Sequence, residues 1–245
     1  MRRIALCTAL AMLALAAVPA VAADPVAHLS VNPNKAGAGS DATLDVNPPR
    51  KNQNPNSSAL RVVRGVKFDP RARPNKCSKD QANANNCPKI SRIGGGTARA
   101  TVKSKTGAFD PFEVKIDVNL FLMAPQQEGD LAGVAAIFKV RANGQKGHSI
   151  GRVTKLATGP YGIKTSFGAI GGAVKPPAGT TAHLDHVHLV FGGSRTVTNT
   201  VTGESHTYYL IRNPKTCDGT WEYQVRLGYP SGGPVVFNGS GPCQP

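Results

Sequence analysis

The stretch EVKIDVNLFL, residues 113–122, decides the fold class of this chain. Apolar side chains stand at every second position from Val114 to Leu122, and charged or polar side chains separate them as far as Asn119. A period of two places one set of side chains on one face of a β-strand, so this face is expected to lie on a hydrophobic core. The stretch WEYQVRLGY, residues 221–229, repeats the pattern, with Trp221 on its apolar face. These two stretches predict a sheet that covers a core.

Shorter apolar runs, separated by Gly, Pro and Asn, predict further strands. They lie at residues 60–68, 98–102, 134–140, 150–156, 163–167, 184–191, 206–211 and 235–237. The sequence contains no sustained apolar stripe of period 3.6, so helices longer than one or two turns are not expected. We therefore predict an all-β fold, an antiparallel β-sandwich of about 8–11 strands.

The N-terminus has the features of an export signal. Arg2 and Arg3 precede an apolar run at residues 4–18 and a small-residue end, AVAA, at residues 20–23. This pattern is typical of a cleavable secretory signal over residues 1–23, and the run is too short for a membrane span. We expect a secreted or cell-surface protein with no transmembrane span after cleavage.

The composition of residues 24–58, rich in Asn, Pro, Gly, Ala and Ser, predicts an extended or flexible N-terminal segment. Residues 59–245 are predicted to form a single β-sandwich domain.

The chain is strongly basic, with 29 Lys and Arg against 14 Asp and Glu and a net charge of +15. Such a charge favours contact with polyanions, such as cell-wall or other anionic polymers. Specific recognition of nucleic acid is not expected from net charge alone. The densest group of cations, a candidate polyanion-binding segment, is Arg61, Arg64, Lys67, Arg71, Arg73 and Lys76. The competing interpretation is an ordinary solvated basic surface.

Four cysteines lie beyond the signal: Cys77, Cys87, Cys217 and Cys243. An even number in an exported chain is expected to be paired, and four allow three connectivities. Local pairing of the first two and of the last two is the simplest. Neither local pair has the C-x-x-C spacing of metal or redox sites, so we expect structural disulfides. SKDQ, residues 78–81, fits a capping box, which predicts one short helical turn between Cys77 and Cys87.

The stretch HLDHVH, residues 183–188, is the candidate metal site. On a strand, His186 and His188 share one face, and a third ligand would come from His206, His148 or elsewhere. The competing interpretation is the exposed face of an ordinary strand.

The sequence has no G-x-S-x-G turn, no phosphate-binding loop and no supported carboxylate pair. We therefore assign no catalytic residue, expect no cofactor and favour a non-enzymatic protein.

The cysteines and their neighbours carry a resemblance to a known family. The motifs are KFDP at 67–70, RPNKCS at 73–78, CPKISRIGGGTA at 87–98, FGAI at 167–170, NPKTC at 213–217, GTW at 219–221 and PC at 242–243. This pattern resembles a family of secreted β-rich domains common in actinobacteria. The resemblance implies an exported, sandwich-like fold with paired cysteines and no transferable catalytic or binding residues. Our leading hypothesis is a non-enzymatic exported or cell-surface protein, for example a wall-associated or adhesive module. Polyanion binding and metal binding are the alternatives.

Overall fold

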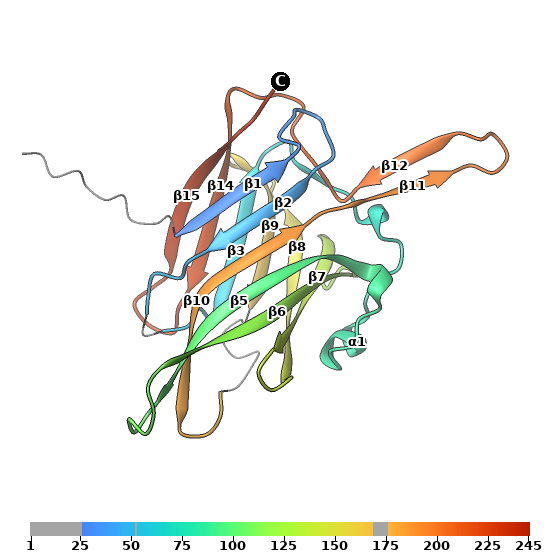
Figure 1. Ribbon diagram of the computed structural model, residues 1–245. Helices are drawn as coiled ribbons and strands as arrows, with labels where there is room; N and C mark the ends of the chain where they lie inside the picture. Colours follow the sequence, from blue (N-terminus) through green and yellow to red (C-terminus); the bar gives the residue numbers. More distant parts are fainter. Residues whose placement is uncertain (1–25, 52, 169–175) are drawn as a thin grey trace, which may run out of the picture.

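The fold is one large antiparallel sheet with small additions (Figure 1). The computed structural model describes residues 26–51, 53–168 and 176–245, and eleven strands in these ranges form the sheet. They are β1 Ala27–Asn32, β2 Asp41–Val46, β3 Ser57–Val63, β5 Arg92–Ser104, β6 Phe112–Met123, β7 Asp130–Val140, β8 Lys146–Lys155, β9 Tyr161–Gly168, β10 Thr180–Phe191, β14 Thr220–Gly228 and β15 Val235–Pro242. The predicted all-β antiparallel fold is confirmed, and each predicted apolar run overlaps a strand.

The remaining described elements are short. β4 Lys67–Phe68 pairs with β13 Ile211–Arg212, and β11 Ser194–Thr198 pairs with β12 Ser205–Tyr209. The β11–β12 hairpin projects from the body of the sheet (Figure 1). The helical segments are η1 Pro70–Ala72, α1 Lys79–Asn83 and η2 Lys89–Ser91. Among the described residues no helix has the length and apolar character needed to cross a membrane.

The sheet curls until its two edge strands, β1 and β15, approach each other. Its order is β1-β2-β10-β5-β6-β7-β8-β9-β3-β14-β15. At the seam the hydroxyl of Tyr223 donates to the carbonyl of Ala27 at 3.2 Å, and the amide of Gln244 donates to the carbonyl of Asn34 at 2.9 Å. Because each of the eleven described strands is antiparallel to the next, β1 and β15 run in the same direction, and the bridge between Lys35 and Gln244 is parallel. The two layers expected of a sandwich are therefore opposing walls of one nearly closed sheet.

The strongest sequence patterns face the interior as predicted. The side chains of Val118 and Leu120 on β6 and of Val225 and Leu227 on β14 are buried in one core cluster. Trp221, at the start of β14, lies at the end of this interior, and its indole N–H donates to the carbonyl of Thr216 at 3.1 Å. Burial of these alternating side chains provides most of the driving force for the sheet.

The opposite face of β6, β7 and β8 carries a second, smaller core. Phe121, Met123, Ala135 and Ile137 point outward there and are covered by the segment from Cys77 to Cys87, which includes α1. This outer core explains why residues 121–123 break the alternation of β6: apolar side chains are buried on both faces.

Residues 24–58 were predicted as an extended segment before the domain, but their described part contributes to the sheet. β1 pairs with β2, β2 pairs with β10, and β3 begins at Ser57. The inward side chains of Leu29 and Val46 are buried, so even these short strands add to the core. The sheet therefore starts at Ala27, whereas the predicted signal, residues 1–23, lies outside the described residues.

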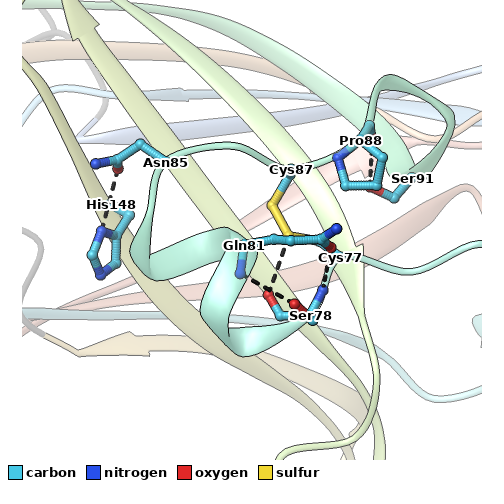
Figure 2. The surroundings of a disulfide bond; sticks show 8 residues. All are labelled: Cys77, Ser78, Gln81, Asn85, Cys87, Pro88, Ser91 and His148. Atoms are coloured by element: carbon cyan, nitrogen blue, oxygen red, sulfur yellow. Dashed lines mark hydrogen bonds between the residues drawn. A yellow bond between two sulfur atoms is a disulfide. The ribbon is translucent and has the colours of Figure 1, made fainter.

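The described cysteines form both predicted local disulfides. Cys77 joins Cys87 with a Cα–Cα distance of 5.1 Å, and Cys217 joins Cys243 with 5.9 Å. The predicted short helix begins after Ser78: the Ser78 hydroxyl accepts from the amide of Gln81 at 3.1 Å, and the Gln81 side chain accepts from the amide of Ser78 at 2.9 Å (Figure 2). The capping box and the disulfide together hold the segment from Cys77 to Cys87 over the outer core.

Candidate functional site

The curled sheet encloses a cavity of about 500 Å³. Its wall consists of aliphatic and aromatic side chains from the inner faces of nearly all the strands of the sheet. The larger of these are Leu44, Leu60, Val62, Ile116, Phe138, Ile163, Phe167, Leu184, Val187, Leu189 and Phe191. Most of them are only partly buried although they face inward, which shows that side chains do not fill the interior.

The number of strands explains why the interior is hollow. A closed sheet of about eight strands is just wide enough to be filled by side chains or to hold one small ligand, and the diameter grows with the number of strands. Protein interiors normally contain few voids larger than a water molecule, so a cavity of about 500 Å³ is unusual for a packed core. It falls within the range of ligand-binding pockets, roughly 300–1,000 Å³.

Small residues on β5 allow the tight curl beside the cavity. A Cβ atom on Gly94 would lie 2.2 Å from the carbonyl oxygen of Val190, and one on Gly96 would lie 1.9 Å from that of His188. Both contacts are far below van der Waals distance, so β10 could not approach β5 this closely with any larger residue. Ala98 and Ala100 continue this inner row and leave the space in front of β5 open.

A few hydroxyl groups interrupt the apolar wall. Ser58 on β3 and Thr165 on β9 line the cavity from neighbouring strands. The Thr165 hydroxyl forms no hydrogen bond with any other described residue. Ser149 also lines the cavity, but its hydroxyl donates to the carbonyl of Gly168 at 2.7 Å. The wall thus offers the hydroxyl group of Thr165 in mainly apolar surroundings, and the polar side chains of Asn54, Lys67 and His183 also line it.

One end of the cavity carries exposed aromatic side chains. Phe112, which lines the cavity at the start of β6, is 49% exposed, and the neighbouring Phe109 is 41% exposed, with the two ring centres 5.6 Å apart. Pro176 and Pro177, just before β10, line the same end. The β5–β6 turn and the start of β10 lie together at the lower edge of Figure 1. Because exposed apolar groups are concentrated here, this end is the candidate mouth of the cavity.

Two of the predicted polyanion-binding residues are used within the protein. Arg71 forms an ion pair with Asp69 at 2.7 Å, and its hydrogen bond is the main cause that lowers the pKa of that carboxyl. The Arg71 guanidinium also lies over the ring of Tyr208, 4.9 Å from its centre. Arg73 donates to the backbone carbonyl of Ser194 at 3.0 Å. These two arginines tie η1 to the β11–β12 hairpin.

The other four residues of the candidate polyanion-binding segment differ in their contacts and exposure. Arg64 donates to the carbonyl of Gly159 at 2.7 Å in the neighbouring turn. Lys67 belongs to β4, and Lys76 is exposed just before Cys77. Arg61 lies on the outer face of β3 and donates to the side chain of Gln224 at 3.0 Å. The segment is thus partly committed to internal contacts, and polyanion binding through it stays a prediction.

The candidate metal ligands His186 and His188 lie on the same face of β10, the outer one. Both approach one carboxylate: the Nδ1 atom of His188 is 2.7 Å, and the Nε2 atom of His186 is 3.4 Å, from an oxygen of Asp45 on β2. Sequence analysis missed Asp45, because it could not show that β2 pairs with β10. Within the described ranges, no group of three or more His, Cys, Asp or Glu side chains is arranged to hold a metal ion. Metal binding by His186 and His188 therefore stays a prediction without support from the geometry.

His183, at the start of the same stretch, is separate from this pair. Its side chain is 12% exposed, and burial is the main cause that lowers its pKa, although the nearby carboxylate of Asp185 acts in the opposite direction. The Nε2 atom of His183 lies 3.8 Å from that carboxylate, and its Nδ1 atom is buried without a hydrogen-bond partner among the described residues. A buried histidine of this kind favours the neutral imidazole.

Comparisons with known proteins add no relative to this description. No family model matches the chain, and no curated protein matches it. The resemblance to secreted β-rich domains therefore rests on the sequence motifs alone.

Proposed function

We propose that this protein is an exported, non-enzymatic binding protein that holds an apolar small molecule in the cavity of its curled sheet. The observation that carries the proposal is the cavity itself, about 500 Å³ in volume with an almost entirely apolar wall. A packed core of the same residues would be more stable, because each buried methylene group contributes about 0.8 kcal/mol. An interior left unfilled at this cost is typical of a ligand site.

The wall defines the chemical class of the ligand. Hydrocarbon suits most of its surface, and the hydroxyl groups of Ser58 and Thr165 suit one small polar group on the ligand. Lys67, Glu222 and His183 also line the cavity, but polar groups make up only a small part of its wall, so a charged ligand would lose more hydration than these few groups can replace. The favoured ligand is therefore a neutral, lipid-like molecule that carries at most one hydroxyl or carbonyl group.

Export is supported by the N-terminal signal pattern and by the two disulfides of the described chain. Disulfides persist in oxidising compartments outside the cytoplasm. A wall-associated or adhesive location remains compatible with this function, because the cavity lies inside the sheet and leaves the outer faces free for other contacts.

A fluorescence titration tests the proposal. The oxidised mature protein is titrated with an uncharged fluorescent lipid analogue, and saturable binding is expected. Ala100→Trp places an indole inside the cavity, whereas Ala157→Trp adds the same group at an exposed turn. We expect the first variant to lose binding and the second to retain it, with folding of both checked by circular dichroism. Absence of saturable binding by the unaltered protein, or equal binding by both variants, would contradict the proposal.

A further inference from the structure

Three cations lie close together on the outer face of the sheet, where β9, β3 and β14 are neighbours. Arg61 on β3 is directly opposite Lys164 on β9. Ala59, the next residue of β3 on the same face, lies between Arg226 on β14 and Ser166 on β9. Opposed side chains on antiparallel strands have Cβ atoms about 5 Å apart, and diagonal neighbours are within reach of long side chains. The three cations therefore surround a patch of small side chains.

This arrangement forms a shallow groove of about 280 Å³. The groove is lined by Arg61, Lys164 and Arg226 together with Ser57, Ser58, Ala59, Ser166 and Phe167. No acidic residue of the described chain lines the groove. Hydroxyl groups and cations both donate hydrogen bonds to anionic oxygen atoms, so the wall is suited to an oxyanion.

The charges of the groove are not compensated within the described chain. Lys164 and Arg226 form no ion pair or side-chain hydrogen bond with it. Arg61 donates to the neutral side chain of Gln224, and its Nε–H group is buried without a partner. Glu222, two residues from Gln224 on the same face of β14, forms no ion pair with these cations.

In contrast to these three cations, one neighbouring arginine forms an ion pair within the protein. Arg152 on β8 is opposite Ser166, and it is held by the buried carboxylate of Asp130 at 2.7 Å. Like charges placed directly opposite each other in a sheet are destabilising. The groove therefore concentrates positive charge at a cost to stability, and an anion would remove this cost.

We propose that the groove formed by Arg61, Lys164 and Arg226 binds a phosphate group, either free or carried on a polymer. A phosphate group offers strong acceptor oxygens and negative charge, which match a planar guanidinium fork and a lysine ammonium group. The three cations lie on the opposite face of the sheet from the cavity, so phosphate binding by them does not depend on the function proposed for the cavity.

Isothermal titration calorimetry with orthophosphate and with inorganic polyphosphate tests this site. The double variant Lys164→Gln, Arg226→Gln removes two cations, and the matched control Lys79→Gln, Lys89→Gln removes two exposed cations from the helical segments. We expect the first variant to bind polyphosphate at least about tenfold more weakly and the control to stay within about twofold.

The two anions identify the form of the ligand. Comparable affinity for both supports a site for a single phosphate, and tighter binding of polyphosphate supports a site for a chain. Equal losses in the two double variants would show that only net charge matters and would overturn the proposal, as would an absence of saturable binding to the unaltered protein. The groove variant is also expected to unfold at an unchanged or higher temperature, because it loses a repulsion, so weaker binding would not reflect unfolding.

Discussion

Replacing Ala136 with leucine is expected to stabilise the protein without ligand, although enlarging a buried residue normally does the opposite. Ala136 is buried on β7 and lines the cavity. Leucine adds three carbon atoms, and at about 0.8 kcal/mol per buried methylene group the gain is about 2 kcal/mol before side-chain ordering is counted. Ordering a leucine costs about 0.5–1 kcal/mol, so the net gain is about 1–2 kcal/mol. The added volume should also weaken binding of an apolar ligand.

The preceding residue provides the control for this prediction. Ala135 lies on the same strand but faces the small outer core under α1, where it is completely buried. Ala135→Leu should overpack that core and destabilise the protein by about 1–3 kcal/mol.

Thermal unfolding of the oxidised mature protein measures both effects. One kcal/mol corresponds to roughly 2–4 °C in a domain of this size, so Ala136→Leu should raise the midpoint by about 2–8 °C and Ala135→Leu should lower it. If Ala136→Leu lowered the midpoint as much as Ala135→Leu, the interior would be filled and the reasoning would be refuted.

Three further predictions concern single features. Thr165→Val should weaken binding of a fatty alcohol by about two- to tenfold and leave an alkane-like probe unaffected in parallel titrations; equal effects would exclude a polar contact. Cys77→Ala with Cys87→Ala should lower the free energy of unfolding in urea by about 2–4 kcal/mol without changing ligand affinity. The hydrogen bond from Arg152 lowers the pKa of Asp130, so its stabilising effect is present above the ordinary aspartate pKa and is lost as the pH falls through the lowered value. Asp130→Asn should therefore be less stable than the unaltered protein at pH 7 and approach it in acid unfolding; a constant difference would contradict this.

The features that sequence analysis predicted correctly depend on local patterns. The alternation in residues 113–122 fixes which side chains of β6 face the core, whatever strand lies beside it. The capping box at Ser78 and Gln81 and the short separation of Cys77 and Cys87 similarly determine α1 and its disulfide within one segment. These interactions join residues close in sequence, so their signal can be read without the tertiary structure.

The cavity and the curl could not be predicted in the same way. They depend on which strands are neighbours, and the sheet inserts β10 between β2 and β5, and β3 between β9 and β14. Alternation shows that a side chain such as Leu60 faces inward, but not whether another side chain fills the space in front of it. The inward apolar residues were therefore interpreted as an ordinary packed core.

The same alternation explains how one pair of strands serves both proposed sites. On β3, Leu60 lines the cavity and Arg61 lies in the outer groove; on β9, Thr165 lines the cavity and Lys164 lies in the groove. Because successive side chains point to opposite faces, a substitution at one of the three cations or at Ala100 alters one site only, although Ser58, Ala59 and Phe167 line both. The groove variants should keep binding the apolar probe, and Ala100→Trp should keep binding phosphate. Loss of both activities in one variant would indicate damage to the shared sheet, so the two titrations must be carried out on every variant.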